Sequence, residues 1–500
     1  TYLSVEADEV YVMIGAPLKR FQDQADFADF KLLMSEPELE QQTDTYFAKV
    51  AEEMNIDQFI DGKAPYLGDT QDDKEGKARF RKYQYIYCKF ENDADQSLYK
   101  SEPWLGHPFH STHRIKLLMM MIQGESFRGG ADINVCECLE LKGEKGFDEI
   151  GGYGMLSFFP LHDPTVVNDL YRTWVVWQQW PWNQPIDKLR MYLGEKAGLY
   201  FGFLCHYTEW LIYIAIPALL VFAAMFKGGF YNTESVFVPP FAVFVCLWAV
   251  LMLEGWKGKQ ATYALEWGMA GFESQEQDRP EYKGDVQWSP IDGEKMTFYP
   301  KYKKQAAANR STIIISCMLL LVLVSIGGVF MLKVALDTDA LAEEIVPNAV
   351  QAIVIQILNA VYRGMAKEMT DNENHQTATQ YEDSLVGKLY LFTFVNSYAA
   401  LYFMAFIQGS TSLGCEKGSC MNDLAYTMVV LFMTNLIVGN AVEIITPMVN
   451  AYLKKQAETG DLDPDADKRV SVAELQYCLE AYDPMESSIE DFTTISIEFG

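Results

Sequence analysis

The sequence predicts an α-helical polytopic membrane protein with an N-terminal cytosolic α/β domain of ferredoxin-like type. Three observations support this class. Six apolar stretches of spanning length follow Leu199, residues 1–190 contain no long apolar run, and the basic residues fall mainly on one side of the predicted spans. We therefore expect two domains, a cytosolic one over 1–190 and a transmembrane one over 191–500.

The second domain is defined by the length of its apolar stretches. An α-helix needs about 20 apolar residues to cross the roughly 30 Å hydrocarbon core of a bilayer. The fourth stretch is the shortest and most polar, and a seventh begins at about residue 490, just before the sequence stops. The six predicted spans are 199–226, 237–254, 311–334, 346–362, 386–408 and 423–446.

The loops between the spans predict the orientation. With the N-terminus inside, the loops 255–310, 363–385 and 447–490 are also inside and carry 15 Lys and Arg residues. The opposite loops carry only Lys227 and Lys417. Lys and Arg accumulate in cytoplasmic loops, and no cleavable leader opens the sequence, so we expect a cytosolic N-terminus. We expect the endoplasmic reticulum or the plasma membrane as the location.

The first domain alternates strand and helix patterns. Strands are predicted at Glu9–Ile14, Tyr83–Phe90 and Ser157–Leu161, and helices over Leu18–Leu33 and Arg114–Gln123. Alternation of this kind is typical of a two-layer ferredoxin-like sandwich.

Charge and composition exclude some functions. The formal charge is −28, and a phosphate-binding surface needs the opposite sign, so no nucleic acid partner is expected. We find no nucleophile–base pair and predict no enzyme. In the outside loop, Cys415 and Cys420 are candidates for a disulfide, and two unpaired thiols are the alternative.

Polar residues follow one face of each of the last three spans. Such residues are costly in lipid, and they either line an aqueous path or form interhelical hydrogen bonds. Both interpretations stay open at this point. The residues are Asn348, Gln351, Asn359 and Tyr362 on the fourth span, Thr393, Asn396 and Ser397 on the fifth, and Asn435, Gly439, Glu443 and Thr446 on the sixth, with Thr434 as a further groove candidate.

The loop after the sixth span has an acidic pattern similar to a calcium-binding EF-hand. Lys468 stands where that loop needs a glycine, so an acidic, solvated linker is the alternative. The pattern comprises Asp463, Asp465, Asp467, Ser471 and Glu474.

Several motifs follow one another in a fixed order along the sequence. They are Phe158–Asp163, Tyr192–Phe201, Trp267, Gly271–Glu273, Arg279–Tyr282 and the Phe-Val-Asn-Ser-Tyr run at 394–398. Together they resemble the anoctamin family of calcium-activated lipid scramblases and ion channels, and the opening Val12–Pro17 is similar to its shorter, intracellular-type branch.

The resemblance implies a homodimer with ten transmembrane helices per subunit. This sequence would hold the first six helices and the start of the seventh, and the C-terminal helices that make the dimer contact would lie beyond it. The implied function is a membrane phospholipid scramblase with nonselective ion conduction, in which lipid headgroups move along a polar groove formed by spans four to six. Membrane phospholipids and ions would be its partners.

The resemblance also implies a Ca²⁺ site. Glu443 and Asp491 match acidic ligands of the family's sixth and seventh helices, with Asn440 and Glu498 as further candidates. Thr494 and Gly439 replace two usual ligands, which implies a weakened site. The alternative is that Glu443 is a lone carboxylate in an interhelical network.

Two other functions stay open. One is a calcium-activated ion channel, and the other is a membrane tether without transport. In the family's chloride channels, lysines stand at the places of Thr393 and Thr434. Threonine at both places removes positive charge that would favour anions, so the resemblance implies that a chloride channel is the weaker hypothesis.

Overall fold

The computed structural model forms two compact units. They are Thr1–Glu209 with Met252–Ala270, and Trp210–Leu251 with Gly271–Gly500. The structure describes residues 1–3, 10–39, 41, 85–101, 106–124, 130–133, 135, 155, 157–176, 179–226, 236–272, 276, 278–279, 281–288, 293, 295–335, 340–410, 420–459, 471–479 and 484–498.

In its described residues, the first unit contains two small antiparallel sheets and several short helices. Strand β1 (Tyr2–Leu3) pairs with β2 (Val10–Tyr11), and β3 (Lys31–Leu33) pairs with β4 (Tyr87–Lys89) in a register that places Leu32 opposite Cys88. The helices are α1 (Leu18–Phe27), the 3₁₀ turn η3 (Gln96–Leu98), α4 (Ser111–Gln123), α6 (Pro164–Thr173) and α7 (Ile186–Leu193). Their core contains Phe21, Leu32, Phe90, Phe109 and Leu117.

One predicted helix in this unit is too long, and one predicted strand does not form. The helix expected over Leu18–Leu33 ends at Phe27, because Asp29 adopts a left-handed φ of 51° and the chain turns into β3. Residues 157–161 have no strand. The helix expected at Arg114–Gln123 is confirmed as α4, and β2 and β4 lie within their predicted ranges.

The first unit also holds one end of each of the first two long helices, α8 (Glu195–Phe226) and α9 (Val238–Glu266). The hydroxyl of Tyr87 donates to the carbonyl of Glu266 at 2.7 Å. Gly268 follows with φ of 69°, and a Cβ there would lie 2.8 Å from the Tyr87 ring. Only glycine satisfies both the backbone conformation and this close approach.

Five described helices are long and apolar enough to cross a membrane. They confirm the first five predicted spans, including the short fourth one, and they occupy residues 195–225, 238–266, 301–332, 349–372 and 378–410. Besides α8 and α9 they comprise α10 (Lys301–Ala335), α11 (Ala340–Asn372) and α12 (Ala378–Tyr402), which continues into the π-helix η7 (Phe403–Ile407) and the 3₁₀ turn η8 (Gln408–Ser410).

The sixth predicted span covers three consecutive helical segments. These are α13 (Cys420–Thr434), the π-helix η10 (Asn435–Gly439) and α14 (Asn440–Thr459). The short α15 (Val472–Tyr477) and then α16 (Pro484–Glu498) follow. Between α9 and α10, strands β5 (Asp285–Trp288) and β6 (Lys295–Phe298) form an antiparallel hairpin.

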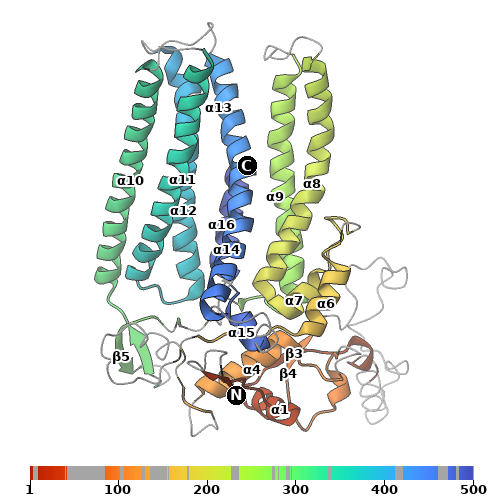
Figure 1. Ribbon diagram of the computed structural model, residues 1–500. Coiled ribbons are helices and arrows are strands. Elements are labelled where there is room, and N and C mark those ends of the chain that lie inside the picture. Colours follow the sequence, from red (N-terminus) through yellow and green to blue (C-terminus); the bar gives the residue numbers. More distant parts are fainter. Residues whose placement is uncertain are drawn as a thin grey trace. The chain divides into compact units, whose positions relative to one another are not determined.

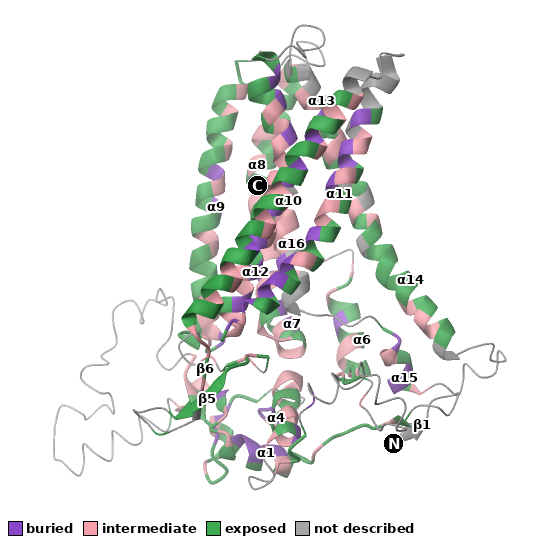
Figure 2. Cartoon of the chain, turned by 90° about the vertical axis from the view of Figure 1, so that its left-hand side faces the viewer, coloured by how far each residue is buried: buried purple, intermediate pink, exposed green. Residues whose placement is uncertain are grey.

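The core of the second unit lies where α10, α11 and α12 run side by side (Figure 1), with α16 packed on α12. Val322, Tyr362, Leu385, Phe392 and Ile489 are buried there. Figure 2 shows exposed residues along the outward sides of these helices, many of them large and apolar. Exposed apolar surface on such long helices fits contact with lipid rather than water.

Candidate functional site

The turn between α11 and α12 holds a buried charged cluster, which we call the turn cluster: Thr370, Glu373, His375, Ser384 and Lys388. Oε2 of Glu373 accepts hydrogen bonds from Nζ of Lys388 at 2.7 Å and from Oγ of Ser384 at 2.9 Å, and lies 2.9 Å from Nε2 of His375. Nζ of Lys388 also donates to Oγ of Ser384 at 2.5 Å and to Oγ1 of Thr370 at 3.2 Å.

Burial and pairing act in opposite directions on Glu373. The side chains of Glu373 and Lys388 are only 6% and 9% exposed. Burial raises the pKa of the Glu373 carboxyl. Hydrogen bonds from His375, Lys388 and Ser311 lower the pKa by more than burial raises it, so the pKa lies well below its ordinary value. Glu373 is therefore ionised at neutral pH and balances the charge of Lys388.

The segment before the hairpin holds this turn from outside. The Arg279 guanidinium lies 3.9 Å from the centre of the Tyr381 ring, and the backbone N–H of Arg279 donates to the carbonyl of Gln376 at 2.8 Å. Asn374 exchanges two hydrogen bonds with the backbone of Lys283, at 3.0 and 2.7 Å. Arg279 belongs to one of the motifs quoted above, and the structure gives it this bracing contact.

Farther along the bundle, an asparagine pair joins α11 to α12. Nδ2 of Asn396 donates to Oδ1 of Asn359 at 2.8 Å and to the carbonyl of Ile355 at 3.0 Å. Asn396 is fully buried, and its Oδ1 has no hydrogen-bond partner among the described residues. Leaving such an acceptor unpaired costs about 1–3 kcal/mol, so a water molecule or a polar ligand would be favoured there.

Tyr362 connects the asparagine pair to the turn cluster. Its hydroxyl donates to the carbonyl of Lys388 at 3.2 Å, and its ring stacks on Phe392 with a centroid distance of 3.8 Å. Asn359, Tyr362 and Asn396, all singled out in the sequence, thus lie at one helix interface. Their contacts are the interhelical kind that was one of the two interpretations of the polar faces.

The other polar candidates are more dispersed. Gln351 is buried, Thr393, Ser397, Thr434 and Gly439 are partly buried, and Asn440 is exposed. Asn435 begins the π-helix η10, and Gly439 ends it. π-Helical turns often occur at functional sites. The side chains of Asn348 and Asn435 lie outside the described residues.

The predicted calcium ligands are only partly visible. Asp491 is partly buried on α16, and Asn440 begins α14, where its Nδ2 donates to the carbonyl of Leu436 at 2.7 Å. The side chains of Glu443 and Glu498 are not described. Within the part of the chain that was searched, no group of three or more His, Cys, Asp or Glu residues could hold a metal.

In the acidic loop, the structure shows only the last two candidates. Ser471 caps α15, since its hydroxyl accepts a hydrogen bond from the N–H of Glu474 at 3.1 Å, and Glu474 is 1% exposed. A serine followed three residues later by glutamate is a common helix start. Asp463, Asp465, Asp467 and Cys415, together with the Cys420 side chain, lie outside the described residues.

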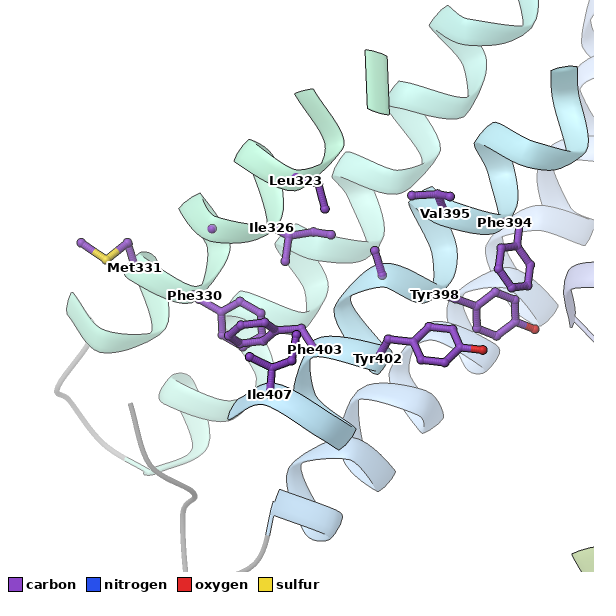
Figure 3. A pocket seen from close by; sticks show the side chains of 12 residues that line it. Leu323, Ile326, Phe330, Met331, Phe394, Val395, Tyr398, Tyr402, Phe403 and Ile407 are labelled. Carbon is purple, nitrogen blue, oxygen red and sulfur yellow. The ribbon is translucent and has the colours of Figure 1, made fainter. Parts of the chain in front are cut away.

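An apolar cavity of about 620 Å³ lies between α10 and the end of α12. Figure 3 shows Phe330 of α10 against Phe403, and the hydroxyls of Tyr398 and Tyr402 pointing the same way, away from α10. The described residues that line it are apolar or aromatic apart from Gly327, and none of them belongs to the turn cluster. Such a lining suits a hydrocarbon chain.

Our sequence analysis missed the turn cluster. Lys388 is the third residue of the predicted span 386–408, and a charged residue within a span is a signal for a buried partner. Glu373 and His375 lie in the predicted loop 363–385, whose Lys and Arg residues indicated only the orientation of the spans. Their pairing with Lys388 depends on how tightly the turn closes.

The helices and the buried polar sites define a polytopic helical membrane protein. Comparison with known proteins identifies its family. The family model described as "Anoctamin: Calcium-activated chloride channel" matches residues 189–500, and the chain belongs to the anoctamin family.

Curated relatives agree with this assignment. The chain is 27% identical to mouse Anoctamin-7 over 63% of its length and 47% of that protein's. It is 30% identical to mouse Anoctamin-10 over 58% and 43% of the respective lengths, and 25% identical to human Anoctamin-5 over 69% and 48%. The chain therefore spans about half the length of the curated relatives it matches.

Proposed function

We propose that this protein is part of a phospholipid scramblase with accompanying nonselective ion conduction. The observation that carries the proposal is the buried polar seam between α11 and α12, from Asn359 and Asn396 through Tyr362 to the turn cluster. Family membership supports a transport-related interpretation of that seam, because the matching family model is described as a calcium-activated chloride channel.

A lipid headgroup crosses a bilayer only where polar groups replace water. On this proposal, Gln351, Asn359, Asn396 and Asn435 would line that path. The α11–α12 contact at Tyr362 and Phe392 would have to separate for a headgroup to pass. The unpaired Oδ1 of Asn396 supports the proposal, because it is an acceptor for a water or a headgroup donor in the middle of a span.

The charges support nonselective conduction over chloride selectivity. Lys388, in the turn cluster at one end of the seam, is a buried cation, and Glu373 compensates its charge at 2.7 Å. Thr393 and Thr434 add no charge. The described part of the seam therefore has no net positive field to favour anions.

Calcium control is part of the proposal. Glu443 and Asp491 would hold the ion with Asn440 and Glu498, because Ca²⁺ prefers carboxylate and amide oxygens. The amide nitrogen of Asn440 is engaged by Leu436, which leaves its Oδ1 as the candidate ligand. When bound, the ion would neutralise carboxylates that otherwise repel one another in the membrane.

The proposal extends to the assembly, the domains and the location of the protein. They are a homodimer, a cytosolic N-terminal domain over 1–190, a transmembrane domain over 191–500, and a location in the endoplasmic reticulum or plasma membrane. The sided distribution of Lys and Arg supports this orientation.

A scrambling assay tests the proposal. The full-length protein is reconstituted in liposomes with fluorescent phospholipids, and external reduction is followed with and without calcium. Replacing Gln351, Asn359 and Asn435 together by Leu should slow scrambling severalfold and leave the dimer intact. Gln356→Leu, on the exposed side of the same helix α11, is the matched control and should scramble normally.

The same vesicles distinguish the alternatives. Chloride flux without lipid transfer would indicate the ion channel that the family description names. Absence of both activities in a folded, reconstituted protein would leave the membrane tether.

A further inference from the structure

Four of the ten tryptophans in the chain are concentrated in residues 174–182, shortly before the first span. The stretch 174–186, which we call the Trp segment, contains no Asp, Glu, Lys or Arg. Charged residues make up 22% of the whole chain, and the net charge is −28. An uncharged, tryptophan-rich segment in so acidic a protein requires an explanation. Its tryptophans are Trp174, Trp177, Trp180 and Trp182.

The described residues of the Trp segment have a defined shape. Nε1 of Trp174 donates to Oε1 of Gln184, and Nε2 of Gln184 donates to the carbonyl of Trp180 at 3.3 Å. The N–H of Asn183 donates to the same Trp180 carbonyl at 3.0 Å. These bonds close a compact turn between α6 and α7. The backbone that carries the exposed side chains therefore has a fixed conformation.

The turn presents aromatic surface outward. Trp180 and Trp182 stack with a centroid distance of 4.8 Å and an interplanar angle of 18°. They are 62% and 44% exposed, and Tyr171 and Val175 nearby are 63% and 58% exposed. A stacked indole pair facing water is unfavourable, because each large ring leaves much apolar area unburied.

A ring contact fixes the Trp segment to the first membrane-spanning helix. Trp174 meets Phe201 of α8 edge to face, with a centroid distance of 5.0 Å. Phe201 is the seventh residue of α8, about 9 Å along the helix from its start. Figure 1 shows α6 and α7 beside this end of α8, within the first unit. The exposed indoles are therefore held at the end of a span, where a bilayer surface must lie.

We propose that the Trp segment is an interfacial anchor whose Trp180–Trp182 stack inserts into the headgroup–acyl boundary of the leaflet on the side of the N-terminal unit. Tryptophan prefers this boundary because its ring is apolar and its N–H can still reach polar groups. The absence of acidic residues keeps the segment from being repelled by anionic lipid. The neighbouring Arg172 is exposed and adds attraction.

Fluorescence quenching of the full-length protein in liposomes tests the anchor. Emission from the Trp180→Phe/Trp182→Phe variant is subtracted from that of the unsubstituted protein, which isolates the signal of the stack. The probes are lipids brominated near the headgroup end of the acyl chain, and aqueous iodide. Phe keeps the apolar surface, so folding should be preserved, and gel filtration verifies it.

The expected result is a difference signal that brominated lipid quenches by more than half and that iodide quenches little. Trp267→Phe is the control, because Trp267 is 6% exposed in the same unit and its signal should resist both quenchers. Quenching by iodide alone would show that the stack faces water and would overturn the proposal. Resistance to both quenchers would overturn it too, since protein would then cover the stack.

Discussion

Nζ of Lys388 on α12 lies 2.7 Å from Oε2 of Glu373 in the turn after α11, and neither side chain is more than a tenth exposed. This pair is the charged centre of a cluster that closes one end of the helical bundle. Removing one partner of a buried ion pair strands the other charge, which costs about 3–5 kcal/mol.

Lys388→Met should therefore lower the thermal unfolding midpoint of the purified protein substantially. Glu373→Gln should have a similar effect. The double variant should be more stable than the sum of the two losses predicts, because neither charge is then left alone. Scanning fluorimetry of the four proteins gives this double-mutant cycle.

An exposed ion pair in the same protein is the control. Lys259 and Glu209 lie 3.1 Å apart with side chains 46% and 42% exposed. Lys259→Met should cost less than about 1 kcal/mol, since exposed pairs contribute little. Equal losses at the two lysines would contradict a special role for the turn cluster.

The depressed pKa of Glu373 predicts how the protein responds to acid. Burial raises this pKa, but the hydrogen bonds from His375, Lys388 and Ser311 outweigh burial and hold it below the unfolded value. Its contribution to stability is therefore complete above the ordinary glutamate pKa of about 4.3 and is lost as the pH falls through the folded value.

Comparison of unfolding midpoints at pH 7 and below pH 4 checks this sign. The gap between the unsubstituted protein and Glu373→Gln should be wide at pH 7 and narrow in acid. Glu209→Gln serves as the control, with a small gap at both pH values. A Glu373→Gln gap that widened in acid would refute the assignment.

The membrane architecture was predictable because each span is a local property of about 20 residues. The ends of the helices and the residues of the candidate site were less predictable from the sequence. Leu18–Leu33 was predicted as one helix, but its last residues pair with β4, which lies more than 50 residues away in the sequence. Pairing at that distance is not encoded in local periodicity.

Part of the candidate site was likewise predictable from local sequence, and part was not. The periodicity of α11 placed Asn359 and Tyr362 on one face, and the structure joins Asn359 to Asn396 and Tyr362 to the backbone of Lys388. Periodicity did not decide whether such a face lines a path or forms interhelical bonds, because both uses require the same residues. The partners of Lys388 depend on the closure of a turn, which hydropathy does not report.

The asparagine pair gives a prediction that separates these two uses. Asn396→Leu removes a fully buried donor that serves Asn359 and Ile355, so it should destabilise the protein by about 1–2 kcal/mol. If the pair also belongs to the lipid path, scrambling should fall even at temperatures where the variant is fully folded.

Asn359→Leu/Asn396→Leu completes this experiment. Removing both amides restores matched apolar surfaces, and stability should recover partly. Scrambling that recovered along with stability would show that the pair only joins the helices. Scrambling that stayed low in the stable double variant would support the path.

The predicted Cys415–Cys420 disulfide is tested by mass spectrometry. Four residues separate the two cysteines, in a loop expected on the oxidising side of the membrane. The non-reduced peptide should be two hydrogen masses lighter than the reduced one and should resist alkylation. Two alkylated thiols in protein prepared without reductant would disprove the disulfide.

The last prediction concerns Glu443 and Asp491, which we expect to bind Ca²⁺ together in the full-length protein. Glu443 is a carboxylate in the sixth predicted span, where a charge is costly unless it has a partner. Thr494, one helical turn after Asp491 on α16, stands where the family pattern offers a second acid. Affinity rises with the number of charged ligands, so Thr494→Glu should shift calcium activation of scrambling to lower concentrations, by roughly tenfold. Thr493→Glu is the matched control, since it adds the same charge on a neighbouring face of α16 and should shift activation little.

Glu443→Gln should raise the calcium concentration required for activation by a similar factor. An unchanged calcium response in Glu443→Gln would show that the site is vestigial, and transport would then have to be constitutive or absent.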